Sequence, residues 1–150
     1  MNPVRTVLPA LVALAVTALG ASASAGAQVR AEETYRNVHS GLCMDDSDGG
    51  GLRGYQCNGN NHQKWVVTRH TDDARQFSNM ATGRCLDDSA AGLRTWPCNG
   101  LDFQKWKLQR SDGRLMFRNV STGACVADPG EGRRLIALPC ASGSANQQWQ

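Results

Sequence analysis

The chain has 150 residues, and its 16 Lys and Arg residues against 13 Asp and Glu residues give a formal net charge of +3. The basic residues are scattered and form no block of four or more. Charge therefore gives no reason to expect a nucleic acid or an anionic membrane as partner.

Residues 1–27 are predicted to be a secretory signal peptide. Arg5 precedes an apolar run over 7–19, and small residues at 21–27 offer cleavage points. An uncleaved membrane anchor is the alternative, but the run is shorter than the about 20 residues that cross a bilayer. The remaining residues, 28–150, are predicted to be one secreted domain without membrane insertion.

This domain contains three copies of one unit at a spacing of about 41 residues, roughly 33–73, 74–114 and 115–150. Each copy holds an aromatic-x-Asn segment and a Gly-x-Cys segment. The copies close with Gln63-Lys64-Trp65, Gln104-Lys105-Trp106 and Gln147-Gln148-Trp149. Short apolar runs bounded by glycine-containing turns predict strands, and three copies are too few for a propeller. We therefore expect an all-β fold with pseudo-threefold symmetry, in which Trp65, Trp106 and Trp149 fill the core.

Six cysteines are distributed as two in each copy, 14, 13 and 15 positions apart. The repetition favours pairing within each copy, as Cys43–Cys57, Cys85–Cys98 and Cys125–Cys140. Each bond would close a loop of about 15 residues and contribute roughly 3 kcal/mol to stability. Zinc sites usually use closely spaced cysteine pairs, and this sequence has none, so no metal or other cofactor is expected.

Three Gln-x-Trp triplets in register with three cysteine pairs, and Cys85-Leu86-Asp87 in the second copy, resemble the ricin B-type lectins and the family 13 carbohydrate-binding modules. The second copy is also similar to the mannose-binding lectin actinohivin. The resemblance extends from about Thr34 to Gln150. It implies a β-trefoil, a short barrel capped by hairpins, and glycan binding without catalysis.

The resemblance also places a carboxylate two residues after the first cysteine and an aromatic ring two residues before the second. A carboxylate accepts hydrogen bonds from sugar hydroxyls, and a ring covers a C–H face of the sugar. Repeats one and two have both groups, whereas repeat three has Ala127 and Leu138 and is expected to be inactive despite keeping Asn146 and Gln147. The predicted sugar-binding residues are Asp45, Tyr55, His62, Gln63, Asp87, Arg94, Trp96 and Gln104.

Two departures from the family pattern affect the expected sugar. Arg53 and Arg94 stand where the family has an amide, and they would either donate to hydroxyls or select an acidic sugar. His62 and Phe103 stand where the family has Asn. Structural roles remain alternatives for the aspartates, rings and glutamines of the set. The following aspartates, Asp46, Asp88 and Asp128, are expected to be turn or capping residues.

Two other functions compete with sugar binding. Glycosidases need two carboxylates about 5–10 Å apart. Asp45 and Asp46 would point to opposite sides of a strand, and Asp87 belongs to another repeat. A protein-binding β-trefoil, such as a secreted protease inhibitor, would need one exposed loop in one repeat, whereas here acid and ring occur twice. The sequence therefore predicts a secreted, bivalent, monomeric lectin whose partner is a glycan or polysaccharide.

Overall fold

The computed structural model describes residues 31–150, so the predicted signal peptide at 1–27 lies outside the described residues. Within residues 31–150 no helix has the length and apolar character needed to cross a membrane. The described part consists of short strands and single 3₁₀ turns, as expected for an all-β chain.

The elements repeat with the period of the sequence. In repeat one they are β1 (Ala31–Glu33), β2 (Cys43–Ser47), β3 (Gly51–Tyr55), η1 (Asn61–Gln63) and β4 (Trp65–Arg69). In repeat two they are β5 (Arg75–Asn79), β6 (Cys85–Ser89), β7 (Gly92–Trp96), η2 (Asp102–Gln104) and β8 (Trp106–Ser111). In repeat three they are β9 (Arg114–Asn119), β10 (Cys125–Ala127), β11 (Ile136–Leu138) and η3 (Ala145–Gln147).

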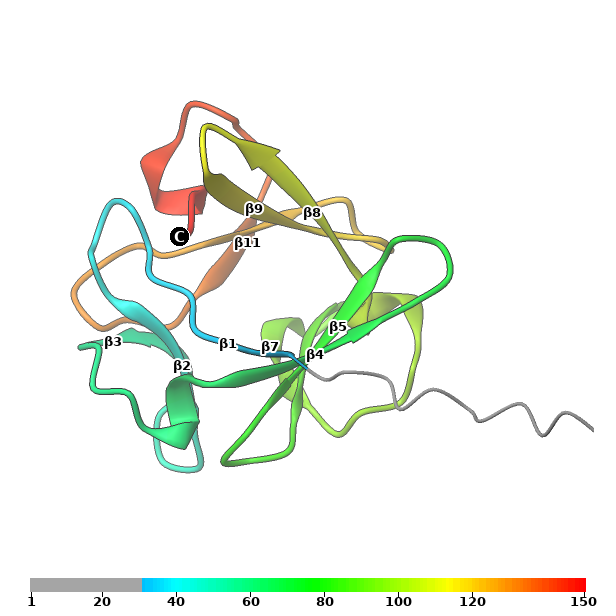
Figure 1. The fold of residues 1–150 in the computed structure, drawn as a ribbon, viewed down its shortest axis with the longest axis horizontal. Coiled ribbons are helices and arrows are strands. Elements are labelled where there is room, and N and C mark those ends of the chain that lie inside the picture. The colour runs from blue at the N-terminus through cyan, green and yellow to red at the C-terminus, as the bar shows by residue number, and fades with distance from the viewer. Residues whose placement is uncertain (1–30) are drawn as a thin grey trace, which may run out of the picture.

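The strands form a closed barrel with a hairpin on each repeat. Strands β1, β4, β5, β8 and β9 are antiparallel neighbours in that order. Trp149 closes the ring through bridges to Leu115 and Asn37. The hairpins are β2–β3, β6–β7 and β10–β11. Figure 1 shows the repeats as lobes around a common centre, with the C-terminus beside the cyan N-terminal segment. The pseudo-threefold all-β fold predicted from the sequence is confirmed.

Aromatic residues from all three repeats meet in the core. The rings of Tyr35, Phe77 and Phe117 contact one another edge to face, with centroids 4.8 to 5.8 Å apart. Burial raises the pKa of the Tyr35 hydroxyl, which donates a hydrogen bond to Glu33. The tryptophans of the Gln-x-Trp triplets are fully buried, so their predicted core role is confirmed.

Each of these tryptophans also attaches its barrel strand to the hairpin above it. The indole N–H donates to the carbonyl of the residue that follows the first cysteine of the repeat. The acceptors are Met44 for Trp65 at 3.1 Å, Leu86 for Trp106 at 3.0 Å and Val126 for Trp149 at 3.3 Å. A buried indole N–H needs a partner, and here the partner fixes the position of the hairpin.

The three disulfides join the cysteines predicted from the repetition, Cys43–Cys57, Cys85–Cys98 and Cys125–Cys140. Their Cα–Cα distances are 5.1, 5.1 and 5.0 Å. Each bond joins the first strand of a hairpin to the segment directly after the second strand. The pairing prediction is therefore confirmed in all three repeats.

The aspartate three residues after the first cysteine of each repeat bonds to the next repeat around the ring. Asp46 accepts from the Thr82 hydroxyl, Asp88 from the Thr122 hydroxyl, and Asp128 from the Ser40 hydroxyl. The predicted turn or capping role is wrong for Asp46 and Asp88, which lie inside β2 and β6. Asp128 does cap a turn, since it also accepts from the Gly130 backbone N–H at 2.8 Å.

Asp46 makes the densest of these connections, and its removal tests their contribution. The Asp46→Ala variant should lose about 3 kcal/mol of unfolding free energy, because the Thr82 and Thr95 hydroxyls and Arg84 Nε and Nη2 all lose the carboxylate to which they donate. Urea denaturation of the oxidised protein measures this loss. Asp48→Ala is the matched control: its side chain is 89% exposed, it pairs only with Arg84, and the change should stay within about 0.5 kcal/mol. Equal losses for the two variants would contradict the prediction.

Candidate functional site

The two predicted sites lie on equivalent hairpins with the same register. In β2–β3 Cys43 is opposite Tyr55 and Asp45 is opposite Arg53. In β6–β7 Cys85 is opposite Trp96 and Asp87 is opposite Arg94. Residues two apart on a strand share a face, so disulfide, carboxylate, guanidinium and ring all lie on one side of each hairpin.

Each aspartate of the predicted set is bound from two sides. Asp45 accepts from Arg53 Nε at 3.1 Å and from Gln63 Nε2 at 3.3 Å. Asp87 accepts from Arg94 Nε at 3.3 Å and from Gln104 Nε2 at 3.2 Å. Both aspartates are only 2% exposed, so the carboxylates lie beneath the surface and are paired there, as buried charges require.

The arginines lie between the buried carboxylates and the exposed rings. The Arg53 guanidinium carbon is 4.2 Å from the centroid of the Tyr55 ring, and that of Arg94 is 3.9 Å from the Trp96 ring. Tyr55 is 43% exposed and Trp96 is 46% exposed. Each guanidinium is therefore held at Nε by a carboxylate and on one side by a ring, a cation–π arrangement.

The surface of each site consequently presents an exposed ring beside an arginine side chain that is 28% exposed in repeat one and 31% exposed in repeat two, with Arg94 Nη2 also 3.5 Å from Ser89 Oγ. Arg53 occupies the same position in repeat one as Arg94 in repeat two, but it was missing from the predicted set. The hairpin register contained the signal: once Cys43 is opposite Tyr55, Asp45 must be opposite Arg53. The carboxylates, expected to accept directly from sugar hydroxyls, accept from these arginines in the structure, and their contact with a sugar stays a prediction.

The glutamines of Gln-x-Trp hold the loop that follows each hairpin. Gln63 Oε1 accepts from the Asn58 backbone N–H at 2.8 Å, and its Nε2 donates to the Gln56 carbonyl at 2.9 Å. Gln104 makes the equivalent bonds to Asn99 and Pro97. Both glutamines are fully buried, so they support the carboxylates from inside the molecule.

The residue before each glutamine contributes mainly through its backbone. The His62 carbonyl accepts from Asn79 Nδ2 at 2.7 Å, and the Phe103 carbonyl accepts from Asn119 Nδ2 at 2.8 Å. The His62 ring donates from Nδ1 to the Asp46 carbonyl at 2.8 Å. Since the carbonyl makes the shared contact, the position accommodates histidine in one repeat and phenylalanine in another.

Repeat three keeps the loop but lacks every surface group of the site. Ala127 is fully buried and lies opposite Ile136, at the positions that aspartate and arginine occupy in the other repeats. Leu138 replaces the ring. Gln147 still accepts from the Ala141 N–H at 2.8 Å and donates to the Pro139 carbonyl at 3.0 Å.

A cleft of about 260 Å³ lies beside the Trp96 site. Arg94, Trp96 and Arg84 line it from repeat two. The hydrogen bonds to Asp46 raise the pKa of the Arg84 guanidinium. Among residues 31–150, no group of three or more histidine, cysteine, aspartate or glutamate residues is arranged to hold a metal ion.

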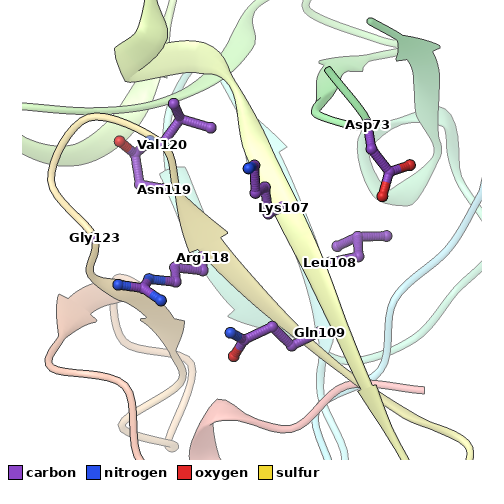
Figure 2. A pocket seen from close by; sticks show the side chains of 8 residues that line it. All are labelled: Asp73, Lys107, Leu108, Gln109, Arg118, Asn119, Val120 and Gly123. Carbon is purple, nitrogen blue, oxygen red and sulfur yellow. The ribbon is translucent and has the colours of Figure 1, made fainter. Parts of the chain in front are cut away.

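A second hollow, of about 390 Å³, lies along β8 and β9 (Figure 2). Lys107 and Arg118 come from directly opposite positions of the two strands, and Asp73 lies on the other side of β8 from Arg118. Its apolar lining is aliphatic, from Leu108 and Val120, and of the described residues that line it none belongs to the predicted sugar-binding set. This hollow is therefore separate from the two hairpin sites.

Comparison with known families decides what kind of domain these sites belong to. The ricin-type beta-trefoil lectin domain matches the chain over residues 31–149. The chain belongs to this lectin family. No curated protein matches the sequence. The similarity of the second repeat to actinohivin stays a sequence-based prediction.

Solved structures share the β-trefoil fold of this lectin domain at low sequence identity. The designed threefold-symmetric protein ThreeFoil has a TM-score of 0.71 and 22% identity, covering 79% of this chain and 96% of its own. SeviL bound to asialo-GM1 saccharide has a TM-score of 0.68 and 14% identity, and the match covers 80% of this chain and 94% of SeviL. The exo-β-1,3-galactanase of Clostridium thermocellum has a TM-score of 0.69 and 20% identity, and the match covers 79% of this chain but 29% of the galactanase. This chain thus corresponds to one part of the galactanase and to nearly all of ThreeFoil and SeviL.

The empty third repeat allows the buried carboxylate–arginine pair to be tested by reconstruction. Ala127→Asp should lower stability by about 2–4 kcal/mol, because the new buried carboxylate has only Gln147 Nε2 within its repeat as a donor. Adding Ile136→Arg should recover about 1–3 kcal/mol by supplying the missing opposite guanidinium. Urea denaturation of both single variants and the double variant gives the coupling. A coupling near zero would show that the arginine does not stabilise the buried aspartate.

Proposed function

We propose that this lectin-family protein binds carbohydrate without catalysis, through two equivalent surface sites on the hairpins of repeats one and two. One observation supports this most directly: an exposed ring and an oriented arginine occur together twice, at the same position of two repeats. The family consists mainly of carbohydrate-binding domains, and its neighbours include SeviL, whose structure contains asialo-GM1 saccharide.

The chemistry of each site suits a sugar. A pyranose has a C–H face that packs against a flat ring, and hydroxyls at its rim that need polar partners. Trp96 supplies the ring in repeat two, and the terminal nitrogens of Arg94 supply hydrogen-bond donors beside it. Because Asp87 and the ring already hold Arg94, its ordering on binding costs little entropy.

The aspartates and glutamines of the predicted set have a supporting role in this proposal. Asp45 and Asp87 fix the direction in which the arginines point, and Gln63 and Gln104 hold those carboxylates. His62 is half-buried, and its ring bonds the Asp46 carbonyl of β2. The sugar would therefore contact Tyr55 with Arg53 in one site and Trp96 with Arg94 in the other.

Two sites on one rigid body make the protein bivalent. A polysaccharide or a cluster of glycan chains that spans both sites would bind with an apparent affinity about 100-fold or more above that of one site. We further propose that the protein is secreted after removal of residues 1–27 and acts as a monomer. Its three disulfides fit an oxidising compartment.

Catalysis is not part of the proposal, because the candidate acids are already occupied. Asp45 and Asp87 each accept from an arginine and a glutamine, and they belong to different hairpins. Asp46 is fully buried between repeats and bonded to Thr82, Arg84 and Thr95. A glycosidase needs one free acid and one free base on either side of the scissile bond.

Removing the rings tests the two-site assignment. Trp96→Ala and Tyr55→Ala should each weaken binding to an immobilised polysaccharide by about tenfold, and the double variant should lose binding, because each removes a stacking surface. A glycan array of the oxidised protein identifies the ligand, and surface plasmon resonance then measures the variants. Leu138→Ala, at the same position of repeat three, is the matched control and should bind normally. Loss of binding in Leu138→Ala with normal binding in Trp96→Ala would refute the assignment.

Replacing the arginine tests which polar group faces the sugar. Arg94→Gln should weaken binding to the array ligand by about tenfold, because the oriented donors are lost while Trp96 remains. Isothermal titration with the Tyr55→Ala background isolates the repeat-two site. Tighter binding by Arg94→Gln would instead mean that the arginine covers Asp87 and that the carboxylate is the true sugar ligand.

A further inference from the structure

The cleft beside Trp96 is built from all three repeats. Repeat one contributes Asp48 and Gly51 at the tip of the β2–β3 hairpin, repeat two contributes Arg94 and Trp96 from β7, and repeat three contributes Arg134. Its volume is about 260 Å³. The cleft therefore exists only because the hairpins meet around the symmetry axis.

Arg134 breaks the threefold pattern of the sequence. The residue that precedes the leucine shared by the three repeats (Leu52, Leu93 and Leu135) is Gly51 in repeat one and Gly92 in repeat two, but Arg134 in repeat three. The backbone around Arg134 pairs with β3, through Leu135 N–H to the Leu52 carbonyl at 3.3 Å. A Cβ placed on Gly51 would lie 3.5 Å from Arg134 Nη2, which places this guanidinium over the tip of β3.

The charges of the cleft leave one cation without a partner. Arg84 donates to both oxygens of Asp46 and pairs with Asp48 at 3.0 Å. Arg94 is paired with Asp87. Arg134 is exposed, and within residues 31–150 its side chain has no hydrogen-bond or ion-pair partner. Because Arg84 is shared by Asp46 and Asp48, the positive and negative charges around the cleft balance, and what the cleft offers an anion is the unpaired guanidinium of Arg134.

We propose that this cleft binds the carboxylate of an acidic sugar residue, with Arg134 as its ionic partner and Trp96 against the adjoining sugar ring. The inference rests on the proposed carbohydrate binding and names a ligand class for the repeat-two site. A guanidinium presents paired N–H donors that match a carboxylate, and such charge-assisted bonds are stronger than neutral ones. Because Trp96 lines both the hairpin site and the cleft, one glycan chain can occupy both.

The test compares polyuronates with the same polymers after reduction of their carboxyl groups to alcohols. Polygalacturonate and alginate serve as probes, at fixed ionic strength near 0.15 M. The native protein should bind at least one polyuronate about tenfold more tightly than its carboxyl-reduced form. Arg134→Gln should abolish most of this preference while its binding to the reduced polymer stays unchanged.

Arg133→Gln provides the matched control. It removes the same charge at the neighbouring position, but Arg133 points to the Gly130 and Pro129 carbonyls and to Glu131, and it does not line the cleft. The preference of the Arg133→Gln variant for the polyuronate over its reduced form should differ from that of the native protein by less than twofold, as expected for a general electrostatic effect. Thermal unfolding of both variants verifies that they are folded, since both side chains are exposed.

The outcomes separate this inference from the proposed function. The acidic-sugar site would be overturned if the protein bound a polyuronate and its carboxyl-reduced form with equal affinity. It would also be overturned if Arg134→Gln and Arg133→Gln lost the preference for the polyuronate equally. In both cases Trp96→Ala would still weaken glycan binding. If Trp96→Ala left binding to every glycan unchanged, the proposed function would fail as well, and with it the ligand class inferred here.

Discussion

The hydrogen bond from each buried indole to the hairpin above it determines where every other functional group lies. Its acceptor is the carbonyl of Met44, Leu86 or Val126, and in each repeat the next residue is the one at the aspartate position. The bond holds the first hairpin strand on the barrel, and the disulfide holds the second strand against the first. Cross-strand pairing then brings the arginine and the ring to fixed positions. The surface chemistry is thus set from the core outward.

The features that hold the fold together occur in all three repeats, whereas the surface site occurs in only two. Indole bonds, disulfides, inter-repeat aspartates and buried glutamines occur in all three repeats, because closing the barrel requires all three. The aspartate–arginine–ring group occurs in two. Repeat three loses this group without losing its fold, since Gln147 retains its two backbone partners and the buried position of Ala127 needs no polar partner. An arginine without aspartate, or an aspartate without arginine, would leave a charge uncompensated, so the pair is present or absent together.

Most of the fold was predictable because its signals are local and repeated. Three Gln-x-Trp triplets, paired cysteines and glycine turns fix the repeats, the disulfides and the buried tryptophans. The inter-repeat bonds of Asp46, Asp88 and Asp128 were not predictable in this way, because their partners lie in the next repeat around the ring, which for Asp128 is repeat one. The direction of a short aspartate side chain in a strand depends on which repeat packs beside it, and this is a property of the closed ring.

The sequence predicted which strand positions the rings and aspartates of the candidate site occupy, but not the order in which these groups lie from the interior to the surface. Tyr55 and Trp96 are exposed as expected, whereas the aspartates are buried. They are paired with arginines at positions where the family has amides. The hairpin tips differ in length, and the cysteine spacings of 14 and 13 residues differ with them, so both hairpins keep Asp opposite Arg. Counting back from the second cysteine locates Arg53 as well as Arg94, but it does not show that each guanidinium lies between the buried aspartate and the ring. Arg134 required the assembled structure, because the cleft that it lines has walls from three repeats.

Substituting arginine for the amide changes how a site of this kind would recognise its ligand. A buried carboxylate already satisfied by Arg94 and Gln104 has little acceptor capacity left for hydroxyls, so recognition shifts from acceptors to donors. Donors favour ligands rich in acceptor oxygens, and a carboxylate is the strongest such acceptor on a sugar. The unpaired Arg134 beside the same ring extends this preference in the same direction. Both features follow from single positions in a framework whose backbone is otherwise the same in each repeat.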